Sequence, residues 1–251
     1  MARILSDEST LTRKRRHLEK EGRVLTVVSR AEFVLAGVLL IAGGVVLWLF
    51  GKSFVLILGG IVLFLAVGHR MSIREDERER GHVAAGLRGE TQITRLLKAA
   101  LPDDTYIFND LNLKHGFHKA QVDHIVVSPR GLFVIETKNW RGTIRGKERE
   151  AQWQQIRNPG DRPVSVSNPI QQNERHVSVL KGCLAKAGID WPDIISVIVD
   201  TSPGSSFDVP DHTVPLLGPD DLVDYIAGFS PDRPHETRDV DAVVKLLMGE
   251  P

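Results

Sequence analysis

The sequence contains a single cysteine, Cys183, which excludes an internal disulfide bond and fits a reducing compartment. It also lacks a phosphate-binding P-loop, a dinucleotide glycine fingerprint, a Ser-His-Asp arrangement and any internal repeat. These absences argue against several common enzyme classes. The function must therefore be sought in other charged and polar side chains.

The chain also has no net charge, since its 32 basic and 32 acidic side chains cancel. These charged side chains are nevertheless unevenly distributed along the sequence. Residues 114–157 carry nine basic and four acidic side chains, whereas residues 188–251 carry three basic and 13 acidic ones. A basic segment suits a polyanion such as nucleic acid, although a solvated surface is the common role of such a run. The acidic region could instead dock a protein partner.

Two stretches, residues 33–51 and 53–68, contain no charged side chain, and only Lys52 separates them. The first is long enough to span a hydrocarbon core, and the second is slightly short. Trp48 sits where an interfacial anchor belongs. A buried hairpin in a soluble protein is the alternative. We expect an N-terminal two-helix transmembrane hairpin.

Basic residues flank this hairpin on both sides. They are Arg13, Lys14, Arg15, Arg16, Lys20, Arg23 and Arg30 before it and Arg70, Arg74, Arg78 and Arg80 after it. By the positive-inside rule, both termini are expected in the cytoplasm, with two passes through the inner or plasma membrane.

The expected organisation therefore has four parts. A basic segment (1–30), the transmembrane hairpin (31–69) and a charged linker (70–82) precede a cytoplasmic domain (83–251). The core of this domain is expected at about 85–200, and an acidic extension follows at 201–251.

Charged residues interrupt the apolar strands in the middle of this domain. Val122–Val127 and Leu132–Ile135 are rich in valine and isoleucine, and a short turn joins them, so they predict an antiparallel hairpin. Asp123, Glu136 and Lys138 lie in or beside these strands. Because side chains alternate along a strand, positions 136 and 138 share a face and position 137 points the other way.

Such charges are costly to bury unless they are paired or bind a metal. Two carboxylates could hold Mg²⁺ or Mn²⁺, with the lysine beside a water that the metal activates. The alternative is an ordinary cross-strand ion pair between Asp123 and Lys138, with Glu136 in solvent. The spacing alone does not decide between these readings.

The remaining pattern predicts an α/β fold, in which helices flank a mixed sheet. The expected helices are 83–101, 170–187, 220–227 and 240–248, and the further strands are 106–111, 142–146, 194–199 and 214–217. The apolar run at 194–199 is typical of a strand that is buried on both faces.

The order of short motifs resembles the nuclease-related domain (NERD) family. The matching residues are Gly89-Glu90, Gln121-Val122-Asp123-His124, Glu136-Thr137-Lys138-Asn139-Trp140-Arg141-Gly142 and Asn168-Pro169-Ile170-Gln171. The resemblance covers roughly residues 85–200. This family is grouped with the PD-(D/E)xK phosphodiesterases of restriction-endonuclease-like fold, although Val122 stands here where the superfamily name has proline.

The resemblance implies a role for each matching residue. Asp123 and Glu136 would be metal ligands, with the Thr137 carbonyl as a possible third. Lys138 would position the attacking water, and Glu90 would support the metal site from the first helix. The expected activity is hydrolysis of DNA, or of RNA, by a membrane-anchored nuclease. The alternative is a tethered, non-catalytic nucleic-acid-binding or scaffold module of the same fold.

Four residues are expected to contact substrate: Gln121, Trp140, Arg141 and Gln171. Trp140 and Trp153 could stack on bases, but packing is the commoner role of tryptophan. Gln171 could equally be an ordinary polar residue at a helix start. His115 and His118 have a spacing that can bind zinc but lack cysteine partners. His124 is expected to be a structural, hydrogen-bonded residue.

Overall fold

The computed structural model describes residues 2–4, 12, 15–16, 19, 34–45, 52–192, 194–231 and 235–249. It divides into two compact units. The first comprises Met1–Thr10 and Ala85–Pro251, and the second comprises Leu11–Ala84. Most of the basic segment predicted at 1–30 lies outside the described residues.

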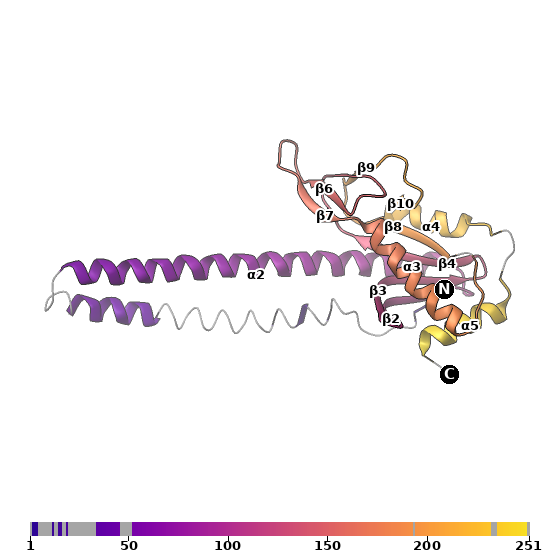
Figure 1. Cartoon of the computed structure of the whole chain (residues 1–251), viewed down its shortest axis with the longest axis horizontal. Helices are drawn as coiled ribbons and strands as arrows, with labels where there is room; N and C mark the ends of the chain where they lie inside the picture. Colours follow the sequence, from indigo (N-terminus) through magenta and orange to yellow (C-terminus); the bar gives the residue numbers. More distant parts are fainter. Residues whose placement is uncertain are drawn as a thin grey trace. The chain divides into compact units, whose positions relative to one another are not determined.

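Six strands form the main sheet of the first unit, in the order β1-β2-β3-β4-β8-β10 (Figure 1). Their bounds are Arg3–Ile4, Tyr106–His115, His118–Ser128, Gly131–Lys138, Ile194–Asp200 and Leu216–Leu217. The strands β2, β3 and β4 are antiparallel, whereas β4 and β8 pair in parallel. The predicted central hairpin and the mixed character of the sheet are therefore confirmed.

Four shorter strands form a second mixed sheet, in the order β7-β6-β5-β9. In that order they are Val164–Ser167, Gln152–Ile156, Thr143–Arg145 and Ser206–Asp208. The sequence predicts only β5, as an edge strand. Trp153 in β6 is buried, and its indole N–H donates to the Lys147 carbonyl at 2.9 Å. This tryptophan therefore packs in a buried apolar cluster beside the sheet and does not present its ring to a base.

Helices cover both faces of the main sheet. The helices α3 (Pro169–Lys186) and α5 (Thr237–Met248) pack on one face through a shared apolar cluster. The other face is covered by α4 (Pro219–Gly228) and by residues 85–100 of α2 (Lys52–Ala100). The predicted helices are thus present, and the acidic C-terminal region supplies two helices of the core.

The helix α3 begins where the sequence indicates. The Asn168 side chain accepts hydrogen bonds from the backbone N–H groups of Ile170 and Gln171, and Pro169 occupies the first turn. An asparagine cap followed by proline is a strong start signal, because both satisfy or remove donors that the helix leaves unpaired. This start fixes which α3 side chains face β4.

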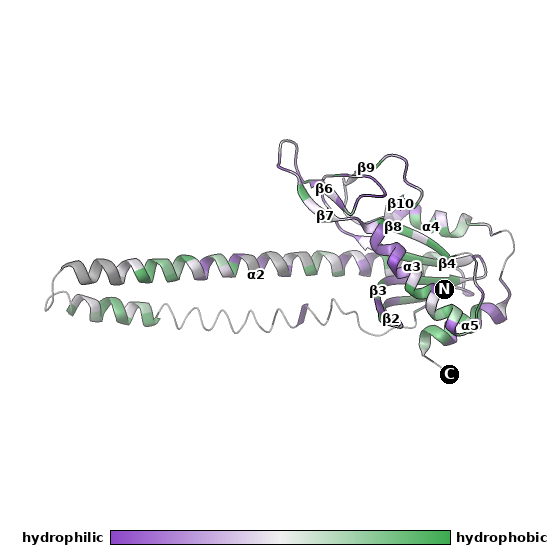
Figure 2. Cartoon of the chain, viewed as in Figure 1, coloured by the Kyte–Doolittle hydropathy of each residue, from purple (hydrophilic) through white to green (hydrophobic). Residues whose placement is uncertain are grey.

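The second unit contains a helix at residues 34–45 and the beginning of α2, which also includes the predicted linker 70–82. Figure 2 colours much of 34–45 hydrophobic. Among the residues that the structure describes, no helix has the length and apolar character needed to cross a membrane. The prediction of two spans is not supported by these residues. Residues 46–51 and the side chains of 52–58, which belong to the predicted spans, lie outside the described part.

Candidate functional site

The site begins where β3 and β4 separate. Their backbone ladder runs from the pair Ser128↔Gly131 to the pair His124↔Ile135 and ends there. At the next position, Oδ2 of Asp123 accepts the backbone N–H of Thr137 at 2.8 Å. The Asp123 carboxylate therefore takes the place of a β3 carbonyl as the acceptor for this N–H, at the point where the two strands begin to diverge. Its side chain is part-buried and points toward the end of β4.

A second acid, Asp110, lies across from Asp123 on β2. The β2–β3 ladder pairs Asn109 with His124 and Leu111 with Val122 but skips the two aspartates between them. Asp110 has a φ of 51°, a left-handed conformation that is uncommon outside glycine. The sequence analysis did not select Asp110. The available signal was an acid inside the apolar run of strand 106–111.

Glu136 on β4 is buried and lies between a lysine and α3. Its Oε1 accepts Nζ of Lys138 at 2.5 Å and Nε2 of Gln172 at 2.7 Å. Its Oε2 has no hydrogen-bond partner among the described residues and lies 3.4 Å from Nδ1 of His176. The alternative reading, in which Asp123 pairs with Lys138 and Glu136 is in solvent, is therefore wrong.

Gln172 was missed by the sequence analysis, which selected Gln171. The amide of Gln172 donates to Glu136, and its Oε1 accepts Nζ of Lys138 at 3.0 Å, so one side chain holds both. His176 lies four residues later on the same face of α3, where burial lowers its pKa and favours the neutral ring. Among the described residues, the Gln171 side chain makes no hydrogen bond with the acids; its backbone N–H donates to Oδ1 of Asn168.

Glu90 reaches the site from α2. Its neighbour Gly89 has no room for a side chain, since an added Cβ would lie 2.5 Å from Oγ1 of Thr201 and 3.4 Å from Cγ2 of Thr137. This close approach brings α2 down onto the ends of β4 and β8. Burial, followed by the charges of Asp110 and Glu136, raises the pKa of Glu90 to about 7, against the opposing effect of Lys138.

Asp123 experiences the same excess of negative charge. Burial, together with the charges of Glu136 and Glu90, raises its pKa well above the usual range. The Thr137 N–H and the Lys138 ammonium oppose this rise but do not cancel it. Repulsion between neighbouring carboxylates is relieved either by protonation or by a cation.

The acids therefore fit a hard divalent cation by charge and by donor type, since carboxylate oxygens are its preferred ligands. The spacing of the side chains, however, limits how many of them could bind one cation. Within the described residues, no group of three or more His, Cys, Asp or Glu side chains is arranged closely enough to hold a metal ion. A cation here would have to use fewer protein carboxylates and complete its shell with backbone or water oxygens.

A network of hydrogen bonds holds the chain in place where β4 ends at Lys138. The Lys138 carbonyl accepts the backbone N–H of Thr201 at 2.8 Å, and the buried Asp200 accepts the backbone N–H of Trp140 at 3.1 Å. The Trp140 ring centroid lies 5.8 Å from Nζ of Lys138. Arg141 is exposed. Trp140 thus stands beside the lysine, and Arg141 is open to solvent.

The histidines separate into structural and peripheral positions. Nδ1 of His124 lies 2.8 Å from Oδ1 of Asn109, and burial lowers the pKa of His124 to about 3. It is thus the buried, hydrogen-bonded residue that the sequence predicts. His115 and His118 face each other at the end of the β2–β3 hairpin. Neither belongs to a metal-holding group among the described residues.

The comparisons with known proteins agree with the motif order. Residues 85–201 match the family model of the nuclease-related domain. The chain therefore carries a NERD domain, and every side chain of the site described above lies within it.

Two curated proteins resemble parts of the chain. An uncharacterized protein of Bacillus anthracis is 33% identical over 97 residues, which are 38% of this chain and 45% of that protein. The "probable kinase PglW" of Streptomyces coelicolor is 30% identical over 127 residues, which are 50% of this chain and 8% of that protein. The chain thus spans less than half the length of either relative. No solved structure gives a significant match.

Proposed function

We propose that this chain is a metal-dependent nuclease of restriction-endonuclease-like fold that hydrolyses phosphodiester bonds in DNA, or in RNA. The family match suggests a nuclease in general terms. The observation that carries the finer proposal is the convergence of Asp123, Glu136 and Lys138, with Glu90 near them, where β3 and β4 separate. Two acids with raised pKa values, Asp123 and Glu90, beside a held lysine suit a charged phosphate substrate and its cation.

Asp123 and Glu136 would hold Mg²⁺ or Mn²⁺, with the Thr137 carbonyl as a third ligand and Glu90 in support. A bound ion of this kind supplies Lewis-acid activation of water and offsets negative charge on the phosphate. The side chains of Asp123 and Glu136 are suited to this role because each is fixed by its own partner, the Thr137 N–H and the Gln172 amide.

Lys138 would act on the substrate side of the site. Gln172 and Glu136 hold its ammonium, and 18% of its side chain stays exposed, so it can orient a water or bind a phosphate oxygen. Trp140 and Arg141, which follow it directly, would contact the nucleic acid, as would Gln121 and Gln171.

We also propose that the second unit attaches the domain to a cell membrane. The support is the two charge-free runs in the sequence with basic residues on both sides. Several apolar side chains of 34–45 and 61–71 are more than half exposed to solvent, for example Ile41 and Phe64. In this proposal both termini and the NERD domain face the cytoplasm.

Cleavage of labelled DNA and RNA by the purified full chain, with Mg²⁺ or Mn²⁺, tests the nuclease. Asp123→Asn and Lys138→Ala should abolish cleavage, whereas the exposed acid Asp241 provides a control, Asp241→Asn, that should leave it unchanged. Cleavage that persists in both site variants would assign the activity to another site or to a contaminant.

A non-catalytic nucleic-acid-binding or scaffold module is the second candidate. It is favoured by the pairing of Lys138 with Glu136, which engages the acid that a metal would need. The match to a small part of a much longer probable kinase also fits a domain that serves as a module. DNA binding that needs no divalent metal and survives Asp123→Asn, without any cleavage, would support this candidate.

The acidic region 201–251 is a candidate surface for a basic protein partner. Because α4 and α5 bury Leu222, Ile226 and Val243 in the core, a deletion would disrupt the fold. Substitution of exposed acids such as Asp220 and Asp241 with asparagine is the suitable test.

A further inference from the structure

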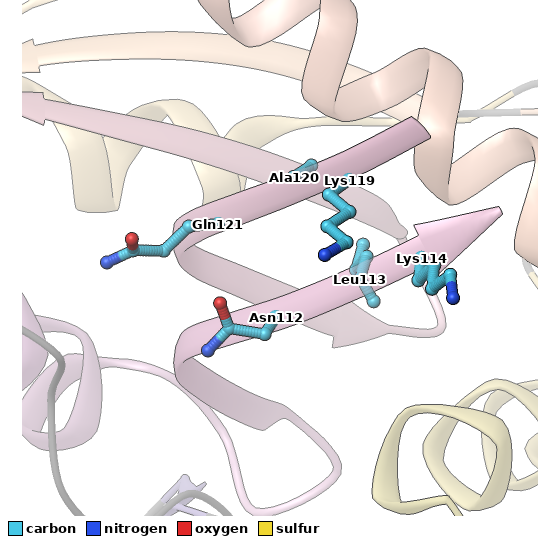
Figure 3. Close-up of a pocket in the computed structure, with 6 residues that line it drawn as sticks. All are labelled: Asn112, Leu113, Lys114, Lys119, Ala120 and Gln121. Atoms are coloured by element: carbon cyan, nitrogen blue, oxygen red, sulfur yellow. The ribbon is translucent and has the colours of Figure 1, made fainter. Parts of the chain in front are cut away.

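The β2–β3 hairpin extends past the acids and carries a hollow of about 420 Å³ on its surface (Figure 3). The hollow is lined by Asn112, Leu113, Lys114, Lys119, Ala120 and Gln121. In the strand register Asn112 faces Gln121, and Lys114 faces Lys119. Paired amides and paired ammonium groups therefore follow one another along the hairpin.

The two faces of this hairpin have different roles. Leu113 and Ala120 are buried in the cluster that α3 and α5 share, so they attach the hairpin to the domain. The amides and lysines that alternate with them are exposed. Neither lysine has an ion-pair partner among the residues that the structure describes. Two unneutralised cations with amide donors beside them can bind anionic oxygens.

The polar strip is continuous with the acid cluster. Nε2 of Gln121 donates to Oδ1 of Asp110 at 2.7 Å, and Asp110 is one of the charges that raise the pKa of Glu90. Gln121 is also two residues from Asp123 and on the same strand. A strand of nucleic acid that occupies the acid cluster would therefore continue over the amides and then the lysines.

The tip of the hairpin carries an exposed aromatic ring. Phe117 is fully exposed, and Gly116 before it adopts a φ of 59° that makes the turn. The flanking His115 is held against α3, since a Cβ at Gly182 would lie 2.5 Å from its ring. The tip is thus braced, while the phenyl ring contacts nothing that would remove it from water. Exposed rings of this kind bind bases by stacking.

We propose that the β2–β3 hairpin binds the nucleic-acid strand next to the acid cluster, through phosphates at Lys114 and Lys119 and an unpaired base at Phe117. The hairpin thereby selects substrates that contain single-stranded nucleic acid. This inference rests on the proposed function, because it assigns the substrate class of the same site. Fully paired duplex stacks its bases internally and offers none to the phenyl ring.

Fluorescence anisotropy of the full chain with labelled single-stranded and duplex DNA, in EDTA so that no cleavage occurs, tests the hairpin. Phe117→Ala should weaken single-strand binding about tenfold and leave duplex binding unchanged. Phe117→Trp, which keeps an aromatic ring, should bind single strands as wild type does. Lys114→Ala with Lys119→Ala should reduce the slope of log affinity against log salt by about 1.4. The exposed lysines Lys98 and Lys245 provide a charge-matched double control, which should keep the wild-type slope.

Full single-strand affinity in the phenylalanine and lysine variants would overturn the inference, as would a wild-type chain that binds no nucleic acid. If the same variants instead lose binding to anionic lipid vesicles and keep nucleic-acid binding, the hairpin is a membrane contact and the inference fails. Hairpin-dependent binding without any metal-dependent cleavage would refute the nuclease alone. Cleavage without hairpin-dependent binding would refute the hairpin alone.

Discussion

At the scale of single residues, the site depends on several carboxylates that lie close together and share one lysine as their counter-charge. Asp123 and Glu90 have raised pKa values, because burial and the charges of neighbouring acids disfavour their charged forms. Lys138 and the Gln172 amide both donate to Glu136 and hold its carboxylate in place. A cation bound beside these carboxylates would offset the repulsion that raises the pKa values of Asp123 and Glu90.

The pH dependence of stability follows from Glu90. Its folded pKa is about 7, above the usual 4.5, so the folded state binds more protons between these values and becomes less stable as pH rises through them. In metal-free buffer, Glu90→Gln should raise the Tm at pH 8 by a few degrees and have little effect at pH 4.5.

Thermal unfolding of the full chain in EDTA, followed by circular dichroism at both pH values, checks this expectation. The exposed Asp241 on α5 provides the matched charge-removing control, Asp241→Asn. A Glu90→Gln variant that is equally stabilised at pH 4.5 and pH 8 would show that the effect does not come from titration of this carboxyl.

Gln172 and Gln171 offer a matched pair for activity. Gln172 holds Glu136 and Lys138 together, whereas the Gln171 side chain hydrogen-bonds to neither of them in the part of the chain that the structure describes. Loss of a partner that orients a metal ligand typically costs 10- to 100-fold. Gln172→Ala should therefore lower kcat/KM for DNA cleavage by about this factor.

The comparison variant Gln171→Ala, measured in the same assay, should lower kcat/KM by less than Gln172→Ala does, because the Gln171 side chain is proposed to contact the nucleic acid but holds neither Glu136 nor Lys138. Equal losses in the two variants would mean that the contacts of Gln172 do not position the site.

At the scale of elements, the site exists because β3 and β4 stop pairing at Asp123 and because α2 approaches the strand ends closely. Gly89 permits that approach, since its missing Cβ is the space that Thr201 fills. The helix α3 completes the arrangement from the opposite face, where its asparagine cap sets the register that aims Gln172 at β4.

Gly89→Ala should destabilise the first unit by about 1–3 kcal/mol, because the methyl group would overlap the Thr201 hydroxyl. Gly228→Ala is the matched control, since an added Cβ there meets nothing within 4 Å. Chemical denaturation of the full chain measures both. Equal free energies of unfolding for Gly89→Ala and wild type would show that α2 can move away without cost.

Much of this element arrangement could be predicted from local patterns. The hairpin of β3 and β4 and the buried β8 follow from valine-rich runs, and charges inside those runs identify Asp123 and Glu136. Gln172 could not be identified, because its choice over Gln171 depends on a helix register that must be known to one residue. Asp110 stands out locally as an acid inside an apolar run, but its place across from Asp123 depends on an interrupted ladder and a left-handed φ, which no local pattern indicates.

Three of the four strands of the second sheet escaped prediction for a different reason. Its strands are three to five residues long, and β6 alternates buried Trp153 with exposed glutamine, a pattern too short to separate from a loop. The strands β5 and β9 also pair although β6, β7, α3 and β8 lie between them in the sequence, a pairing that only the folded chain reveals.

At the scale of the whole molecule, the chain combines a NERD domain with a second unit of different composition. In the first unit, acids and a lysine lie where the central strands β3 and β4 separate, a basic hairpin lies beside them, and the acidic C-terminal region supplies two core helices. The second unit exposes apolar side chains and carries charge-free runs, which support the proposed membrane attachment. A nuclease fixed in this way would act on nucleic acid that comes to the membrane.

Mn²⁺ binding by the full chain, measured by the loss of the free-ion electron paramagnetic resonance signal during titration, tests the central claim most directly. Wild type should bind Mn²⁺ at the acid cluster, and Asp123→Asn and Glu136→Gln should each remove that binding, while Asp241→Asn should retain it. Equal Mn²⁺ binding by wild type and both site variants, or no binding by any of them, would contradict the account.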